Sequence, residues 1–174
     1  MHLSGNREDA SRADPVVRAA LGDLIHRFAW CIDRRDWTGF RACLAPRVTV
    51  GLDTSIGGEG DDAEPEDADG RVLAARDFFE PFDATHHHVT LYSVSHEPGG
   101  DAAEVLSYFR AGHYKQHVLG GATFSQSGHY RHRCARTGVM PDNPTGWHIT
   151  GWRQVIHFTE GNAKLLARGG DGAG

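Results

Sequence analysis

The segment Pro81–His96, PFDATHHHVTLYSVSH, decides the fold, because the chain changes there from helical to strand character. Its Thr85–His96 part is the first of four runs rich in the residues that favour strands, and the others are 102–118, 122–137 and 146–159. Turn-forming residues separate the runs, as at Gly120-Gly121. Consecutive strands joined by short turns predict an antiparallel meander.

Three helices are expected before this segment. The first starts at Asp14-Pro15, a capping residue followed by a proline suited to the first turn, and continues at helical spacing to about Asp33. The second spans Asp36–Leu44 and the third spans Arg71–Glu80, with a short strand at 48–50 between them. Helices followed by a sheet predict an α+β fold in which a curved sheet packs over the helices.

A chain of 174 residues fits one domain. We expect residues 1–14 to form a disordered N-terminal tail, 15–162 the domain and 163–174 a C-terminal tail. Within the domain, residues 54–70 are typical of an acidic, Gly-rich loop. Seven of the 23 acidic residues lie there: Glu59, Asp61, Asp62, Glu64, Glu66, Asp67 and Asp69.

Composition excludes several classes of partner and location. With a net charge of −5, the chain lacks the basic character of a nucleic-acid-binding domain. No stretch approaches the roughly 18 apolar residues of a membrane-spanning helix, and the polar N-terminus lacks the apolar region of a signal peptide. Three cysteines, an odd number without CxxC spacing, predict a reducing, cytoplasmic location.

The three consecutive histidines do not form a metal cluster, because successive side chains of a strand point to opposite faces. His87 shares a face with Thr85 and Val89, whereas His86 and His88 lie on the other face and would need a third ligand from elsewhere. We therefore expect no metal. The Gly-rich segment lacks the lysine and the strand–helix context of a phosphate-binding loop, so no cofactor is expected either.

The face of His87 is suited to a small-molecule pocket if the sheet is concave on that side. The residues expected on it are mostly aromatic with a few polar groups, as in such pockets: Val89, Phe109, His113, Gln126, Tyr130 and Trp152. We expect His129, His132 and His157 on the opposite, outer face of their strands.

The end of the first helix contributes Phe28, Trp30 and Asp33. Asp33 follows an apolar stretch, and a buried carboxylate is costly unless it is paired. A histidine is a natural partner, since the carboxylate would fix its tautomer and leave the other ring nitrogen as a base. The alternative is that Asp33 is a solvated helix end that caps the second helix.

The sequence resembles the SnoaL-like branch of the nuclear-transport-factor-2-like superfamily, which includes scytalone dehydratase, bile-acid 7α-dehydratase and hexachlorocyclohexane dehydrochlorinase. The resemblance covers residues 16–160 and implies a cone-shaped α+β barrel, with N-terminal helices packed on a strongly curved, mainly antiparallel sheet. The residues that carry it are FAWCIDRRDW at 28–37, THH at 85–87, SYFR at 107–110, GHY at 128–130 and GWHI at 146–149.

The resemblance also implies a function. Asp33 and His87 match the acid–base pair of the dehydratase-like members, and His113 matches a second catalytic histidine. It implies a cofactor-independent lyase or cyclase acting on a small hydrophobic molecule, such as a polyketide or another secondary metabolite, and a homodimer or higher homo-oligomer. The alternative is a non-catalytic binding protein or the structural, beta-type subunit of a ring-hydroxylating oxygenase.

Overall fold

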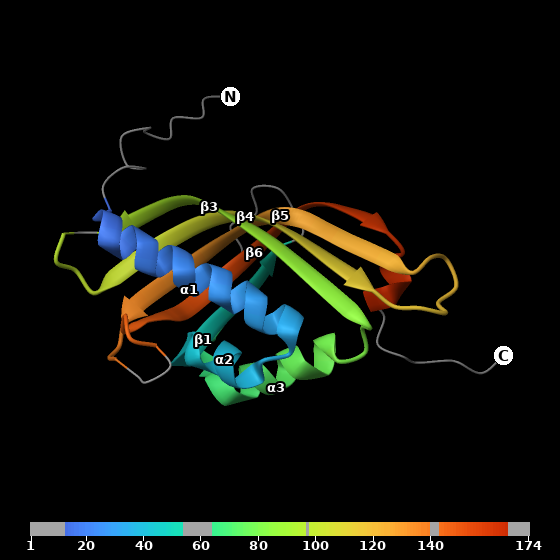
Figure 1. Cartoon of the computed structure of the whole chain (residues 1–174), viewed down its shortest axis with the longest axis horizontal. Helices are drawn as coiled ribbons and strands as arrows, with labels where there is room; N and C mark the ends of the chain where they lie inside the picture. The colour runs from blue at the N-terminus through green and yellow to red at the C-terminus, as the bar shows by residue number, and fades with distance from the viewer. Residues whose placement is uncertain (1–12, 54–63, 97, 140–142, 167–174) are drawn as a thin grey trace, which may run out of the picture.

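The computed structural model describes residues 13–53, 64–96, 98–139 and 143–166 (Figure 1). The predicted tails up to residue 12 and from residue 167, and residues 54–63 of the predicted acidic loop, lie outside the described residues. The elements are α1 (Pro15–Arg34), α2 (Trp37–Ala42), β1 (Leu44–Asp53), β2 (Glu66–Asp67), α3 (Ala68–Phe79), β3 (Ala84–His96), β4 (Ala102–Tyr114), β5 (Thr123–Arg136), β6 (Trp147–Gly161) and a short 3₁₀ helix (Ala163–Leu166).

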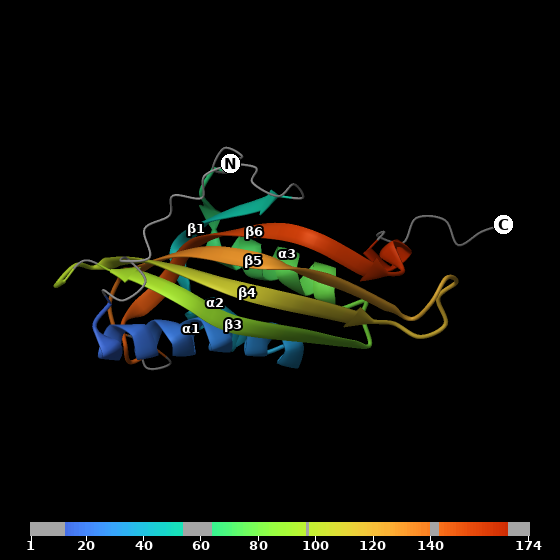
Figure 2. The same cartoon turned by 90° about the horizontal axis from the view of Figure 1, so that it is seen from above.

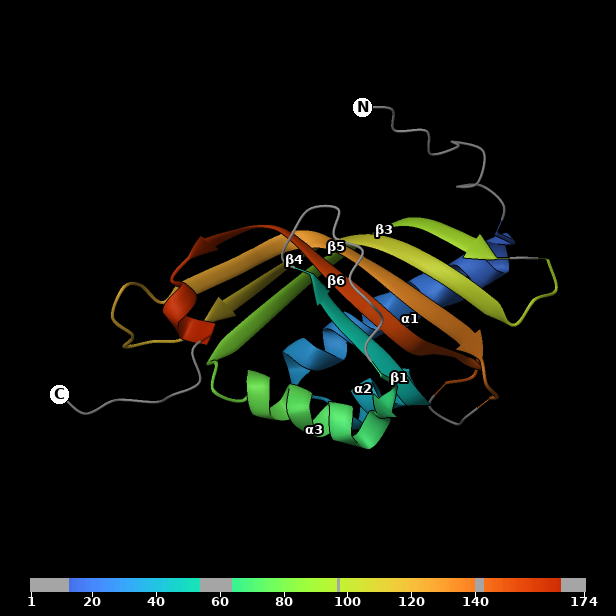
Figure 3. The ribbon, with the colours of Figure 1, turned by 180° about the vertical axis from the view of Figure 1, so that it is seen from behind.

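One mixed sheet runs through the molecule in the strand order β2-β1-β6-β5-β4-β3. The predicted antiparallel meander of β3 to β6 is confirmed. The strands β1 and β6 are far apart in the chain but pair in parallel, and Figure 3 shows them side by side. The sequence did not predict this pairing. The sheet curls over the helices as a cone but stays open, so the fold is an α+β cone and not a closed barrel.

The helices cover the concave side of this sheet. The α1 helix lies along β3 and α3 lies near β1, so the two helices support opposite margins of the sheet (Figure 2). Asp14 caps α1 by accepting a hydrogen bond from the Val16 N–H at 2.7 Å. The buried face of α1 contributes Leu21, Leu24, Ile25, Phe28 and Ile32 to the main core.

Several predicted boundaries differ from the structure: α2 is shorter than predicted, and β1 is longer. The third helix begins at Ala68, three residues before the predicted start, because Asp67 caps it by accepting from the Asp69 N–H at 2.9 Å. The domain extends past residue 162, since Leu165 is buried and packs in a small core with Phe82 and Phe124. Among the described helices, none has the length and apolar character needed to cross a bilayer.

The alternation predicted for β3 is confirmed over its first half. Thr85, His87 and Val89 are partly buried, whereas His86 and His88 are exposed. A shift of register follows Leu91, and similar shifts interrupt the β5–β6 pairing. Such bulges bend a strand and increase its twist, which contributes to the curl of the sheet.

The prediction for His132 is wrong. Residues two apart on a strand share a face, and Tyr130 points inward, so His132 points inward as well. Its side chain is fully buried against the rings of Phe28 and Tyr130, at centroid distances of 5.5 and 5.2 Å. Neither ring nitrogen has a hydrogen-bond partner in the described part of the chain, and burial lowers the pKa of His132 to about 3. His129 and His157 are hydrogen-bonded to each other at 2.8 Å.

His132 predicts an acid sensitivity of the fold. Between about pH 6.5 and pH 3 the unfolded chain binds a proton at this residue and the folded chain does not, so stability falls as the pH falls through this window. Between pH 7 and pH 5 the loss from this residue is roughly 2 kcal/mol. His132→Leu should therefore lose about that much less stability than wild type over the same interval in urea denaturation. Parallel pH dependences of the two proteins would contradict this.

Candidate active site

Asp33 and His87 form a hydrogen-bonded pair between the last turn of α1 and the start of β3. The His87 Nδ1 lies 2.7 Å from Asp33 Oδ1, and the His87 backbone N–H donates to Asp33 Oδ2, also at 2.7 Å. The side chain of His87 is only 5% exposed, and that of Asp33 is 14% exposed. Asp33 is therefore not a solvated helix end. The cap of α2 is Asp36, which accepts from the Gly39 N–H at 2.8 Å.

Arg35 and Thr85 complete the surroundings of this carboxylate. The Thr85 hydroxyl donates to Asp33 Oδ1 at 2.9 Å and accepts from the Arg35 guanidinium at 2.8 Å. The guanidinium also donates to the backbone oxygens of Ile32 and Phe79, at 2.8 and 2.9 Å. Arg35 thus joins the ends of α1 and α3 to the start of β3. This role of Arg35 was not predicted from the sequence.

The position of Arg35 explains how it reaches these partners. It follows directly after α1 in the left-handed conformation, with φ of 57°, and its N–H donates to the last carbonyls of the helix. Such a C-cap is common, although glycine usually occupies it because a Cβ is unfavourable there. The hydrogen bonds of its guanidinium offset that cost.

The electrostatics of the pair favour an ionised Asp33. Burial raises the pKa of the Asp33 carboxyl, but the hydrogen bonds from the His87 ring, the His87 N–H and Thr85 outweigh burial, and the pKa lies below its usual value. An ionised carboxylate only accepts hydrogen bonds, so whenever the His87 ring is uncharged its one N–H proton is on Nδ1. The Nε2 atom is left as a hydrogen-bond acceptor and a potential base.

His87 lines a cavity of about 340 Å³ between the sheet and the helices α1 and α3. Six predicted site residues line it: Phe28, His87, His113, Gln126, Tyr130 and Trp152. The wall is otherwise mainly apolar, with Arg71 and Gln154 as further polar members that were not among the predicted site residues. This composition is typical of a site for a small, largely apolar molecule.

Three predicted pocket residues do not line the cavity. Trp30 is 66% exposed, because it lies two residues from Phe28 on a helix and so points away from the sheet. Phe109 is buried and stacks on Tyr130 at a centroid distance of 4.3 Å, and Val89 packs in the same cluster. Phe109 and Val89 therefore support the wall of the cavity from behind.

His113 also lies at the cavity, among the rings of Phe79, Phe82 and Phe124. Its ring centroid is 6.1 Å from that of His87, and its Nδ1 has no hydrogen-bond partner among the described residues. Burial, followed by the neighbouring His87, lowers the pKa of His113 to about 4. At neutral pH this residue is an uncharged imidazole that can donate or accept one hydrogen bond, and it is not an imidazolium acid.

The strand register places a gap directly beside His87. His87 pairs with Ala111 on β4, and Ala111 pairs with Gln126 on β5, all on the concave face. The His87 and Gln126 backbones are thus about 10 Å apart, two strand spacings, with only a methyl group between them. Tyr130 lines the same cavity, and burial raises the pKa of its phenol, which stays protonated.

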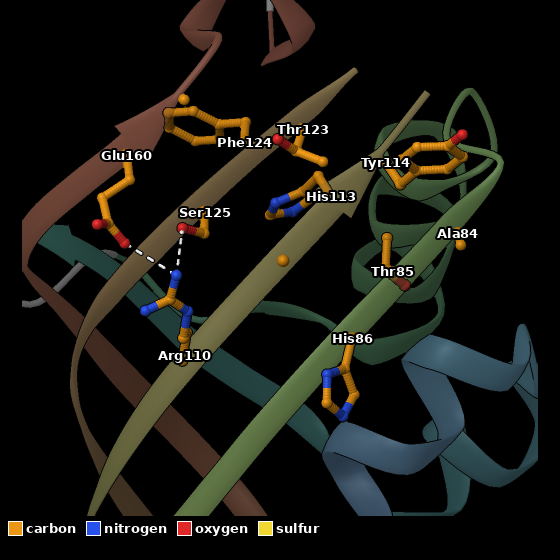
Figure 4. A pocket seen from close by; sticks show the side chains of 12 residues that line it. Ala84, Thr85, His86, Arg110, His113, Tyr114, Thr123, Phe124, Ser125 and Glu160 are labelled. Carbon is orange, nitrogen blue, oxygen red and sulfur yellow. Dashed lines mark hydrogen bonds and ion pairs between the residues drawn. The ribbon is translucent and has the colours of Figure 1, made fainter. Parts of the chain in front are cut away.

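A second hollow, of about 510 Å³, lies around Gly112 and is shown in Figure 4. On the outer face of the sheet, Arg110 is held by Glu160 at 2.8 Å and by Ser125 at 3.4 Å. These three side chains belong to the face opposite His87. Because His87, hydrogen-bonded to Asp33, lines the concave cavity, this cavity is the candidate site. Within the described part of the chain, no three His, Cys, Asp or Glu side chains gather as a metal site.

Three helices packed on an open, curled sheet form a nuclear-transport-factor-2-like fold. Residues 17–153 match the model of the SnoaL-like domain family, and the chain belongs to this family, as the sequence resemblance predicted. Comparison with curated protein sequences returns no match.

Solved structures share the fold at low sequence identity. The Kfla4162 protein from Kribbella flavida is 22% identical over 89% of this chain and 100% of its own, with a TM-score of 0.73. A protein assigned as a scytalone dehydratase, from Novosphingobium aromaticivorans, is 14% identical over 84% and 88%, with a TM-score of 0.66. Hexachlorocyclohexane dehydrochlorinase LinA-type3 from Novosphingobium barchaimii is 13% identical over 85% and 91%, with a TM-score of 0.61.

The geometry predicts the tautomer of His87. At a pH where the ring is neutral, the wild-type protein should carry the proton on Nδ1, because Asp33 accepts it there. In Asp33→Asn the amide can offer either an oxygen or an N–H group, so a mixture of tautomers should appear. Long-range ¹H–¹⁵N correlation spectra of labelled histidine measure this directly. A wild-type ring protonated on Nε2 would contradict the assignment.

Proposed function

We propose that this protein is a cofactor-independent lyase or cyclase of the dehydratase type, with Asp33 and His87 as its acid–base pair. The observation that carries the proposal is the 2.7 Å hydrogen bond between these side chains at the wall of a 340 Å³ apolar cavity. The substrate is a small hydrophobic metabolite, such as a polyketide-derived compound, that fills this cavity.

The reaction begins with a proton transfer from carbon. His87 Nε2 removes a proton from a carbon next to an electron-withdrawing group, and Asp33 stabilises the imidazolium that forms. Gln126 and Tyr130 donate hydrogen bonds to the oxygen on which negative charge develops. In a dehydration, the electron pair of the C–H bond forms the new double bond, and the leaving hydroxyl takes the proton from the imidazolium and departs as water.

The family supports an elimination. The structural relatives named above include proteins called a dehydratase and a dehydrochlorinase, names that denote the loss of water and of hydrogen chloride. Their identity to this chain is below 25%, so they support the type of reaction and leave the substrate to be found by experiment.

A binding protein without chemistry is the alternative, and it would use the same cavity. The acid–base pair favours catalysis, because a binder gains nothing from an imidazole whose tautomer is fixed by a buried carboxylate. A purely structural oxygenase subunit is less consistent with the cavity, since an unfilled hollow in a core lowers stability.

His87→Gln should lower turnover about 100-fold or more of any compound that the wild-type protein converts, the usual contribution of a general base. Asp33→Asn should also lower turnover, since the imidazolium loses its counter-charge. Far-UV circular dichroism should confirm the fold of both variants. Near-wild-type turnover in a folded His87→Gln protein would refute the catalytic role.

Ala111→Leu should abolish binding of substrate by filling the space between His87 and Gln126. The cavity can take the larger side chain, so little stability should be lost. Gly112→Ala is the matched control, because its Cβ would point to the other face and come no closer than 3.7 Å to a neighbouring atom. Unchanged affinity in Ala111→Leu would show that the substrate binds elsewhere.

A further inference from the structure

Arg71 gives the cavity a fixed positive charge. Arg71, Ala75 and Phe79 follow one another at intervals of four residues, lie on one face of α3 and all line the cavity. Among the described residues of the lining, Arg71 alone carries a permanent charge. Its side chain is 24% exposed, so most of it is covered by protein.

Arg71 lies near one end of α3, and the other end of this helix contacts His87. The Phe79 ring contacts His87 at a centroid distance of 5.5 Å and stands parallel to His113 at 6.1 Å. Arg71 precedes Phe79 by eight residues, which is about 12 Å of helix at 1.5 Å per residue. A molecule that fills the cavity can therefore contact His87 with one part and the guanidinium with another.

The ion pair of Arg71 with Glu66 is weak enough for a ligand to compete with it. Its NH1 group donates to Glu66 Oε1 at 3.3 Å, longer than the 2.7–2.9 Å usual for a bond between two charged groups. Glu66 is 41% exposed, so water screens this ion pair. A guanidinium has five N–H donors in a planar fork, which matches the two oxygens of a carboxylate.

We propose that Arg71 binds a carboxylate of the substrate, so that the substrate class is an elongated, apolar carboxylic acid whose reacting carbon lies at His87. This inference rests on the proposed function and narrows it. A carboxylate fits better than a phosphate. One guanidinium among apolar side chains balances a single negative charge, and the second negative charge of a phosphate would be buried without a partner.

The test compares two probes of the same shape, biphenyl-4-carboxylate and biphenyl-4-carboxamide, by isothermal titration calorimetry. The wild-type protein should bind the acid about tenfold or more tightly than the amide, the usual effect of a hydrogen bond to a charged group. Arg71→Gln should weaken binding of the acid by about the same factor and leave the amide unchanged. Arg76→Gln is the control, because Arg76 lies on the same helix, is exposed and pairs with Glu80.

Glu66→Gln separates ligand binding from a structural role. If Arg71 binds the carboxylate, Glu66 competes for it, and Glu66→Gln should bind the acid more tightly than wild type. If Arg71 only holds β2 against α3, both variants should weaken the binding of both probes, which would overturn the inference.

The remaining outcomes distinguish this inference from the proposed function. Equal affinity of the wild-type protein for acid and amide would overturn the role of Arg71 and leave the apolar cavity and its acid–base pair in place. Failure of both probes to bind would overturn the inference together with the cavity on which the proposed function rests.

Discussion

The Asp33 carboxylate holds the end of α1 against the start of β3, and the site depends on this contact. Removing a carboxylate from water is costly unless donors replace the water, and here three donors do so: the His87 ring, the His87 N–H and the Thr85 hydroxyl. Because β3 is an edge of the sheet, no strand of the described residues pairs with its outward N–H groups. Asp33 accepts a hydrogen bond from one of them, the His87 N–H, so one carboxylate both pairs this edge N–H and orients the His87 ring.

The architecture extends from this contact in both directions. Arg35 ties the last turn of α3 to the Asp33–Thr85 pair, so the helix that closes the cavity is anchored beside His87. Across the sheet, the small side chain of Ala111 keeps the floor free next to His87. A curled sheet, two helices and one alanine thus produce a hollow beside an imidazole that Asp33 orients. His113 stays neutral there, because aromatic rings cover it.

Local periodicity and family resemblance predicted much of this arrangement, and non-local pairing explains the rest. The helices, the meander and the inward face of His87 follow from spacing along the chain, and the pairing of Asp33 with His87 followed from the resemblance. The parallel β1–β6 contact joins distant segments and leaves no local signal. The role of Arg35 was not predicted, because it depends on a left-handed backbone conformation at the end of α1 that the sequence does not indicate for an arginine. Arg71 was detectable, since it shares the helical face of Ala75 and Phe79.

The transfer of a carbon-bound proton to His87 is tested most directly by isotope exchange. The purified protein is incubated in D₂O with a library of small apolar metabolites, and each compound is examined by mass spectrometry. Wild type should introduce deuterium at carbon, or release water, in at least one compound, and His87→Gln should do neither. Exchange or water release that persists in His87→Gln would contradict the assignment of His87 as the base.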